Sequence, residues 1–293
     1  KRHHSCKRNT PQKNKEKINK NIILDNLQKE VKSHDKKELR IFQGRDAEHG
    51  EFPYVVALSI KFNKNENVKY KTFCTGSVIT PEWTLTAAHC FPNILKLLSY
   101  KKENESSEEK PVIRFINLSN SNSWSEINII KAVQHPAYIE LHRNIRSTYM
   151  SNDIGLLETE RTIVSSLGKV SSVDFRTLYG QNVIAVGFGL MSLDGKIDVP
   201  LKLNKSLQVF DGMIRKCSSI LRPGGFCLAS NCRKISSLCR GDSGGPVIHP
   251  TGIIGVNSLG NNYYCNKEER YSGTITPVSS YTNWIKSVIK DGS

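Results

Sequence analysis

Short apolar runs separated by polar and turn-forming residues are the main pattern of the chain after Arg40. The runs are rich in β-branched side chains and end at Gly, Pro, Asn or Ser, as strands joined by turns do. This pattern predicts an all-β fold, either a barrel or a sandwich. The runs are Tyr54–Ile60, Phe73–Ile79, Ile127–Val133, Val183–Val186, Val247–Ile248 and Ile253–Val256.

Three segments depart from this strand pattern. The apolar residues of Tyr281–Ile289 repeat at three and four positions, which predicts a C-terminal amphipathic helix. The apolar residues between positions 16 and 32 have roughly helical spacing, so a short helix is possible there. The polar stretch Lys101–Lys110 is predicted to be an exposed loop. No apolar run approaches the ~20 residues that span a bilayer, so no membrane helix is expected.

The positive charge is concentrated at the start of the chain. The 293 residues carry 42 Lys+Arg and 27 Asp+Glu, which gives a net charge of +15. Residues 1–40 hold thirteen of the Lys+Arg and five of the Asp+Glu, which gives this segment a net charge of +8. This segment has no Gly, Trp, Tyr or Phe, so it should not fold alone. We expect a solvated leader, with a basic arm that binds polyanions such as heparan-type glycans or nucleic acid as the alternative. The lack of interleaved aromatics argues against a specific nucleic-acid site.

Three motifs carry the chemistry: Thr86–Cys90 around His89, Asn152–Leu157 around Asp153, and Cys239–Pro246 around Ser243. Taken singly, they could be a structural histidine, a turn aspartate and a tight glycine turn. Together, in the order His, Asp, Ser, they indicate a catalytic triad. A serine hydroxyl needs a base within hydrogen-bond reach, which His89 would supply, and Asp153 would hold the tautomer of that imidazole.

With these motifs, residues 41–293 resemble the trypsin/chymotrypsin family of serine proteases. The segments between the motifs that also fit the family are Ile41–Gly44, Tyr54–Val56, Cys74–Ile79, His135–Tyr138 and Gly187–Gly189. The resemblance implies an all-β fold of two packed six-stranded antiparallel β-barrels with a C-terminal helix and the active site between the barrels. It also implies a basic activation peptide over residues 1–40 and a protease domain over 41–293.

The resemblance further implies peptide-bond hydrolysis through an acyl-enzyme, with an oxyanion hole formed by the backbone N–H groups of Gly241 and Ser243. In this family the inactive chain is cut before an Ile or Val, and the new ammonium group pairs with the Asp beside the catalytic Ser. Here the cut would fall between Arg40 and Ile41, and Asp242 would be the partner. An Arg at the cut implies a trypsin-like activating protease.

The eight cysteines are an even number, which suits disulfides in an oxidising compartment. The resemblance assigns the pairs Cys74–Cys90, Cys217–Cys227 and Cys239–Cys265, which leaves Cys6 and Cys232. We expect these two to pair and tether the leader, although Cys227 and Cys232 could exchange roles and Cys6 could form an intermolecular bond. Metal binding by Cys227 and Cys232 is disfavoured because no partner lies at zinc spacing.

The resemblance also locates a substrate pocket. Its floor would be Ser237, which has no charge to compensate a buried Lys or Arg, and its other residues would be Leu238, Ser258, Leu259, Gly260 and Gly273. This predicts a preference for a large apolar or aromatic side chain before the cleaved bond, the P1 position.

Loops and possible modifications complete the predictions. The segment Cys90–Arg114 is longer than the family's usual loop beside the catalytic His, and it either restricts macromolecular substrates or is a neutral insertion. Asn104, Asn117 and Asn204 begin possible glycosylation motifs. No cofactor motif is present, and the acidic run Glu103–Glu109 lacks calcium-loop spacing.

These features predict a secreted, extracellular serine endopeptidase zymogen that performs limited proteolysis. Its expected partners are a protein substrate, an upstream trypsin-like activating protease, a protein inhibitor and, through residues 1–40, a polyanion. Two alternatives stay open: a regulatory protease homologue without catalysis, and a polyanion-binding protein on a protease scaffold.

Overall fold

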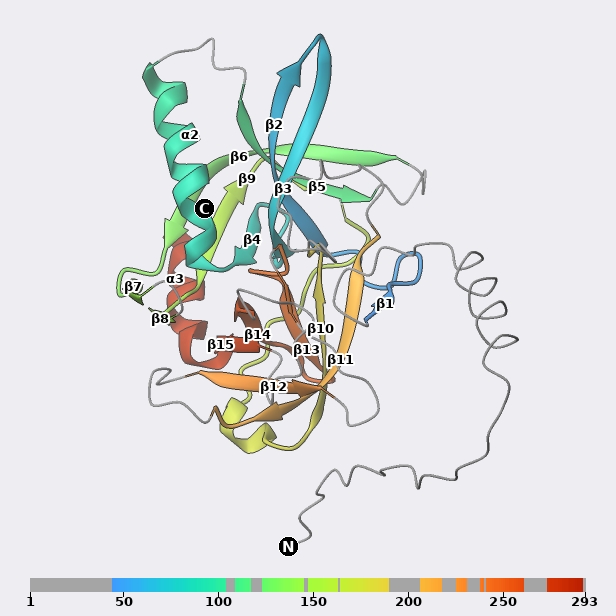
Figure 1. Ribbon diagram of the computed structural model, residues 1–293, viewed down its shortest axis with the longest axis vertical. Helices are drawn as coiled ribbons and strands as arrows, with labels where there is room; N and C mark the ends of the chain where they lie inside the picture. The colour runs from blue at the N-terminus through green and yellow to red at the C-terminus, as the bar shows by residue number, and fades with distance from the viewer. Residues whose placement is uncertain are drawn as a thin grey trace, which may run out of the picture. The chain divides into compact units, whose positions relative to one another are not determined.

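The computed structural model describes residues 44–103, 109–116, 123–144, 147–162, 164–189, 206–217, 225–230, 238–239, 241–260 and 273–291. The chain divides into two units, residues 1–39 and 40–293, and all described residues belong to the second. This second unit is mostly β-structure (Figure 1). Within the described ranges, no helix is both long and apolar enough to cross a membrane.

Six antiparallel strands close the first barrel in the order β2-β3-β4-β9-β6-β5. The long β2–β3 hairpin extends beyond the rest of this barrel (Figure 1). The strands are β2 (Val55–Lys64), β3 (Asn67–Val78), β4 (Trp83–Thr86), β5 (Lys110–Ile116), β6 (Trp124–Gln134) and β9 (Gly155–Thr159).

The second barrel is a ring of six strands, closed by the pairing of β11 with β12, and the short strand β1 (Arg45–Asp46) joins β11 from outside the ring. The ring contains β10 (Asn182–Gly187), β11 (Gln208–Arg215), β12 (Phe226–Ser230), β13 (Pro246–His249), β14 (Gly252–Leu259) and β15 (Gly273–Pro277). The predicted fold class, two six-stranded barrels, is therefore confirmed.

The packing of strand β2 explains why the run Tyr54–Ile60 does not alternate between apolar and polar residues. Val56 and Leu58 point into the core of the first barrel. Val55 and Ala57 point the other way, into a cluster with Phe188 of the second-barrel side. Successive side chains of a strand face opposite sides, so a strand buried on both sides is apolar throughout.

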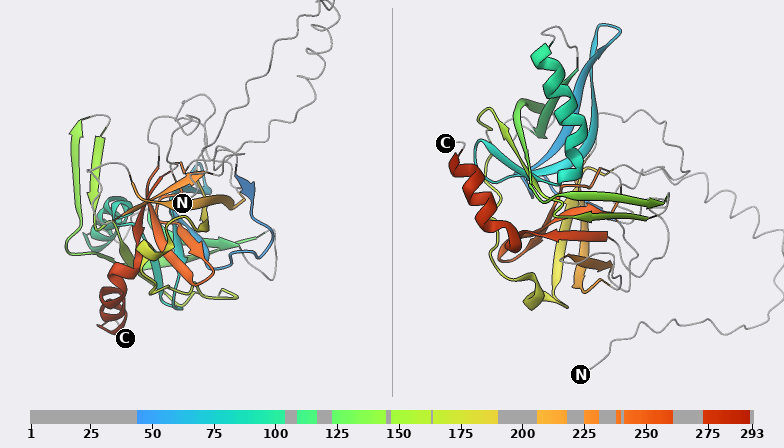
Figure 2. Two further views of the ribbon diagram at one scale, coloured as in Figure 1. Left: turned by 90° about the horizontal axis from the view of Figure 1, so that it is seen from below. Right: turned by 90° about the vertical axis from the view of Figure 1, so that its left-hand side faces the viewer.

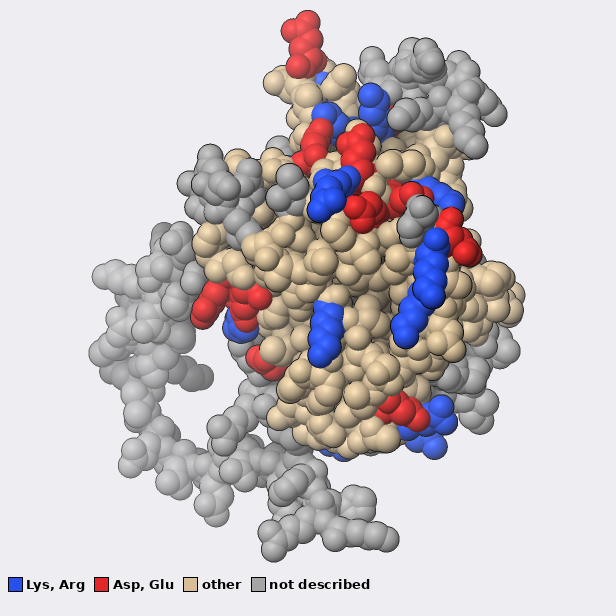
Figure 3. Space-filling view, turned by 180° about the vertical axis from the view of Figure 1, so that it is seen from behind, with Lys and Arg blue, Asp and Glu red and all other residues tan. Residues whose placement is uncertain are grey.

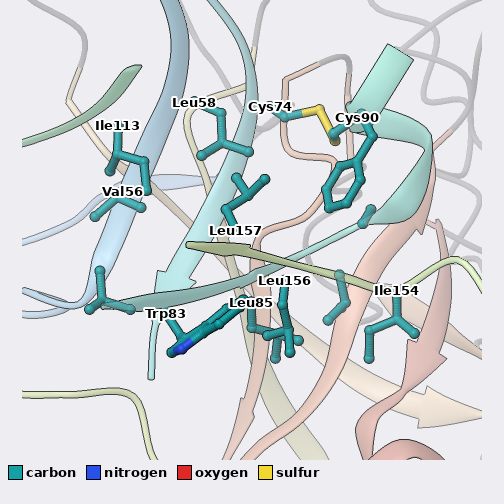
Figure 4. Close-up of a cluster of buried hydrophobic side chains, with 14 of the residues drawn as sticks. Val56, Leu58, Cys74, Trp83, Leu85, Cys90, Ile113, Ile154, Leu156 and Leu157 are labelled. Carbon is teal, nitrogen blue, oxygen red and sulfur yellow. A yellow bond between two sulfur atoms is a disulfide. The ribbon is translucent and has the colours of Figure 1, made fainter. Parts of the chain in front are cut away.

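The core of the first barrel contains Trp83, Leu85, Ile113, Leu156 and Leu157, all nearly inaccessible to solvent. Figure 4 shows these side chains converging from several strands, with the Cys74–Cys90 disulfide at one edge. Ala87 and Cys90 belong to the same core cluster, so the His89 motif is anchored in the core on both sides of His89.

The predicted C-terminal helix is present as α3 (Thr282–Asp291). Its buried residue Ile285 belongs to the core cluster of the first barrel, although the helix follows the last strand of the second. Trp284 also packs edge-on against His135, with ring centroids 5.0 Å apart. The helix therefore connects the end of the chain to the first barrel.

One loop prediction was wrong in part. Residues 91–103 form a helix, α2 (Phe91–Glu103), so the first three residues of the expected loop Lys101–Lys110 are helical. Phe91, Ile94 and Leu97 are buried at a spacing of three, and the helix contacts β5 and β6. Pro92 is tolerated because the first turn of a helix has no intrahelical acceptor for its missing N–H.

A second unpredicted element is the hairpin of β7 (Ile139–Asn144) and β8 (Ser147–Ser151). It projects from the barrels in both views of Figure 2. The hairpin leads directly into the Asp153 motif, so it lies at the edge of the candidate site.

Candidate active site

The first part of the site is the turn that carries His89. Strand β4 ends at Thr86, and a single 3₁₀ turn over Ala88–Cys90 leads into α2. The disulfide between Cys90 and Cys74 of β3 ties this turn to the barrel wall. The His89 side chain is 17% exposed, so it lies at the surface of the core and not within it.

Asp153 lies between the β7–β8 hairpin and β9, and its side chain is only 1% exposed. The preceding residue, Asn152, has a positive φ of 52°, a conformation that costs a non-glycine residue free energy. Its side chain compensates through local contacts: its amide donates to the Ala137 carbonyl at 2.7 Å, and its oxygen accepts from the Tyr281 hydroxyl at 2.9 Å. These contacts fix the direction of the chain as it enters Asp153.

The Asp153 carboxylate accepts three hydrogen bonds. One oxygen accepts from the His89 backbone N–H at 2.9 Å, and the other accepts from His89 Nδ1 at 2.8 Å and from the Ser258 hydroxyl at 2.5 Å. An ionised carboxylate only accepts, so the bond to Nδ1 requires the proton on that nitrogen. Nε2 is then the nitrogen that can take a proton from a nucleophile.

The two charges of this pair stabilise each other. Burial lowers the pKa of His89, but the negative charge of Asp153, its hydrogen bond and the charge of Glu140 outweigh burial and raise that pKa above 6.5. Burial likewise raises the pKa of Asp153, yet the His89 charge and the hydrogen bonds from His89 and Ser258 lower it below 3.8. Asp153 therefore stays ionised and His89 becomes a stronger base.

Ser243 lies on a tight turn just before β13. Its backbone carbonyl accepts from the Thr75 N–H at 2.8 Å, and Cys90 Sγ lies 3.9 Å from the same oxygen. The next residue, Gly244, has a φ of +82°, and a Cβ there would overlap Thr86 Oγ1 and the Thr75 carbonyl. Only glycine lets the serine turn approach the first barrel this closely.

Asp242, the residue before Ser243, is fully buried. Its two carboxylate oxygens accept from the backbone N–H groups of Gly189 and Cys239, each at 2.8 Å. Its carbonyl accepts from Gly245 N–H at 3.0 Å and from the Asn257 side chain at 3.2 Å. A cation buried beside this carboxylate would have the charged partner that a buried ion requires.

The predicted pocket residues are partly described. Leu238 is 1% exposed and belongs to the core cluster of the second barrel. A Cβ on Gly273 would lie only 2.6 Å from Leu238 Cδ1, so the leucine side chain occupies the space beside this glycine. Leu259 is buried as well. Two of the predicted pocket residues are therefore buried leucines.

Two predicted disulfide pairs, Cys74–Cys90 and Cys217–Cys227, are present in the structure. Cys239 is also disulfide-bonded, and its predicted partner lies outside the described residues. Cys74, Cys90 and His89 come close enough to hold a metal ion, but the disulfide consumes both sulfurs. Other predicted residues outside the described ranges are Arg40, Ile41, Ser237, Cys6, Cys232, Cys265, Asn104, Asn117 and Asn204.

Comparisons with known proteins identify the family of the chain. The family model described as Trypsin matches residues 41–285. The chain belongs to the trypsin family. It is 29% identical to serine protease SP24D of Anopheles gambiae over 259 residues, 86% of this chain and 82% of that protein.

Other relatives of this trypsin-family chain include Trypsin Blo t 3 of Blomia tropicalis, 25% identical over 84% of this chain and 85% of the relative. Phenoloxidase-activating enzyme 1 of Spodoptera litura is 26% identical over 85% of this chain and 67% of the relative. Among solved structures, mouse neuropsin, a serine protease expressed in the limbic system of the brain, has a TM-score of 0.59 at 23% identity. That match covers 85% of this chain and all of neuropsin, and it supports the fold alone.

Within this trypsin-family site, two residues have contacts that the sequence did not predict. Ser258 was expected only in the pocket, but its hydroxyl donates to Asp153. Thr75 was expected only as a strand residue, but its hydroxyl donates to the carbonyl of Gly241. Both contacts join residues more than 100 positions apart, so no local sequence pattern could indicate them.

Proposed function

We propose that this trypsin-family chain is a serine endopeptidase in which Ser243 is the nucleophile, His89 the base and Asp153 the residue that orients the base. The observation that carries the proposal is the buried Asp153 carboxylate, which engages both the backbone and the ring of His89. The Ser243 carbonyl beside Cys90 supports the placement of the nucleophile on the other side of His89.

The reaction follows from these roles. Ser243 Oγ attacks the substrate carbonyl carbon while His89 Nε2 takes the hydroxyl proton. The negative charge that develops on the carbonyl oxygen is stabilised by the backbone N–H groups of Gly241 and Ser243. His89 then gives the proton to the leaving amine, which leaves an ester on Ser243. Water hydrolyses this acyl-enzyme by the same proton transfers, and the free serine is restored.

We also propose activation by cleavage between Arg40 and Ile41. The new ammonium group of Ile41 would pair with Asp242, whose buried carboxylate is already oriented by two backbone N–H groups. A charge buried without a partner is strongly destabilising, so the pair would hold the serine turn in place. A cleavable leader suits an extracellular protease with a limited set of protein targets, and one relative is named as an activating enzyme.

For the residue before the cleaved bond, we propose an apolar or aromatic side chain. The buried side chains of Leu238 and Leu259 support this preference. A Lys or Arg side chain would be buried against apolar groups, with only the uncharged Ser237 proposed at the floor.

The test uses the full chain, cut at Arg40–Ile41 with trypsin and then incubated with a fluorescent peptide phosphonate bearing a P1 Phe. We expect the label on Ser243, located by mass spectrometry, and no label in Ser243→Ala. That variant should also lose about 10⁶-fold in kcat, as other triad enzymes do without their nucleophile. Ser99→Ala, at an exposed serine of α2, is the matched control and should label normally.

The same enzyme then digests a peptide library. Faster cleavage after Phe, Tyr or Leu than after Arg is expected, and preference for Arg would overturn the proposed pocket. If complete cleavage at Arg40 gives neither label nor cleavage of any library peptide at any pH, the chain is a non-catalytic homologue and the proposed activity is wrong.

A further inference from the structure

Every polar group of Thr75 is hydrogen-bonded, and its partners belong to three segments: the turn of Gly241 and Ser243, the chain at Phe188, and the end of β4 at Thr86. Its hydroxyl donates to the Gly241 carbonyl at 2.8 Å and accepts from the Phe188 N–H at 3.0 Å. Its backbone N–H donates to the Ser243 carbonyl at 2.8 Å, and its own carbonyl accepts from Thr86. The side chain is completely buried, so water does not compete for these bonds.

The Gly241 carbonyl, which accepts from the Thr75 hydroxyl, is the partner that connects Thr75 to the oxyanion hole. Gly241 has a φ of +94°, which glycine adopts easily. Because glycine has no side chain, nothing within the residue itself limits the rotation of its backbone. The Gly241 carbonyl and the Asp242 N–H form one peptide group, and that N–H donates to the Cys239 carbonyl at 3.1 Å. This peptide group lies between the two peptide groups whose N–H groups, of Gly241 and Ser243, are proposed to bind the oxyanion, so holding it restrains both neighbours. The Thr75 hydroxyl holds this peptide group from the opposite barrel.

The donor to the hydroxyl adds a second restraint. The N–H of Phe188 binds Thr75, and the next N–H, of Gly189, binds the Asp242 carboxylate. Phe188 itself packs against Trp124, with ring centroids 5.6 Å apart. One hydroxyl therefore links three segments: strand β3 (Asn67–Val78), the chain after β10, and the turn that contains Gly241 and Asp242.

We propose that Thr75 is a positioning residue for the oxyanion hole: its hydroxyl holds the Gly241 peptide in the orientation that stabilises the transition state. The inference rests on the proposed serine endopeptidase function. It assigns Thr75 no contact with the substrate, so the effect of losing the hydroxyl falls on kcat and leaves substrate binding largely unchanged.

Three variants of the full, trypsin-activated chain separate this role from a merely structural one. Thr75→Val keeps the shape but removes the hydroxyl, leaving a buried N–H and a buried carbonyl unpaired. Thr75→Ser keeps the hydroxyl. The matched control is Thr84→Val on β4, because the buried hydroxyl of Thr84 has no hydrogen-bond partner among the residues that the structure describes. If Thr75→Val does not fold, Thr75→Ala removes the same hydroxyl with less steric demand.

Three quantities are measured for each variant: kcat, KM and the Ki of a peptide aldehyde whose bound adduct carries an oxyanion. The kcat is expressed per active site, and the active sites are counted by titration with the phosphonate. For Thr75→Val we expect kcat to fall at least about tenfold, a smaller loss than the 10²–10³ typical of a deleted oxyanion donor. KM should stay within about twofold, and the Ki should rise in parallel with the fall in kcat. Thr75→Ser should restore most of the activity, and Thr84→Val should match the wild type.

The inference is overturned if Thr75→Val keeps wild-type kcat per titrated site, or if Thr75→Ser is as impaired as Thr75→Val. In both cases an active wild-type enzyme leaves the proposed function intact. A wild-type chain that is cleaved but neither reacts with the phosphonate nor hydrolyses any library peptide overturns the proposed function, and the positioning role fails with it.

Discussion

Asp153 binds more groups than its short sequence motif suggests. Its carboxylate fixes the backbone of the His89 turn, the orientation of the imidazole and the Ser258 hydroxyl at the same time. The sequence motifs were enough to select His89 and Asp153, because each motif is local. They could not reveal the bond from Ser258, because it forms only when a strand of the second barrel packs beside the first.

The raised pKa of His89 predicts a specific pH dependence. Only neutral His89 can act as the base, so kcat/KM should rise with pH along a limb whose apparent pKa lies above 6.5. Glu140→Gln removes one negative charge that raises this pKa, and the limb should shift to lower pH. The shift should shrink at high salt because counterions screen the interaction.

This measurement has a matched control in Glu160→Gln. Glu160 is exposed and bonded to Asn128, and the charges that raise the pKa of His89 are those of Asp153 and Glu140. Gln at position 140 still offers an acceptor to the Tyr138 hydroxyl, which donates to Glu140 at 2.9 Å. A limb that is unmoved in Glu140→Gln, or moved equally in both variants, would contradict the electrostatic role of Glu140.

At the scale of elements, helix α2 is one that the sequence analysis did not predict. Its apolar residues are spaced as in a helix, but the polar tail at Lys101–Glu103 and the expected position beside His89 favoured a loop. The strands were easier to predict, since each apolar run is bounded by turn residues. Helix and loop differ here only in whether Phe91, Ile94 and Leu97 find an apolar surface, and the first barrel supplies it through β5 and β6.

The packing of α2 can be tested with two neighbouring residues. Ile94 is fully buried in the barrel core, whereas Leu95 is 42% exposed. Ile94→Ala should lower the free energy of unfolding by about 2–5 kcal/mol, and Leu95→Ala should change it by no more than about 0.5 kcal/mol. Chemical denaturation of the uncut chain measures both. Similar effects of the two substitutions would mean that α2 does not pack as described.

For the whole molecule, the strand pattern predicted an all-β class, and the resemblance to the family supplied the two barrels.

The distribution of charge was less informative about function. On the face drawn in Figure 3, Lys and Arg side chains lie among Asp and Glu side chains and do not gather into a single patch. Residues 41–293 still carry a net charge of +7, because 42 − 13 = 29 Lys+Arg exceed 27 − 5 = 22 Asp+Glu. Net charge alone therefore did not locate a binding surface.

The last prediction concerns activation, which involves the leader, Asp242 and the serine turn together. Arg40→Gln should resist trypsin at this bond, and the uncut chain should neither bind the phosphonate nor hydrolyse peptides. Asp242→Asn should be cut normally but lose at least about 10²-fold in kcat/KM, because the Ile41 ammonium would be buried without its carboxylate. Lys37→Gln is the control: it alters the leader by one charge but leaves the bond between Arg40 and Ile41 intact, and it should activate fully. Activity from an uncut Arg40→Gln chain, or full activity in Asp242→Asn, would show that the ammonium–carboxylate pair does not organise the site.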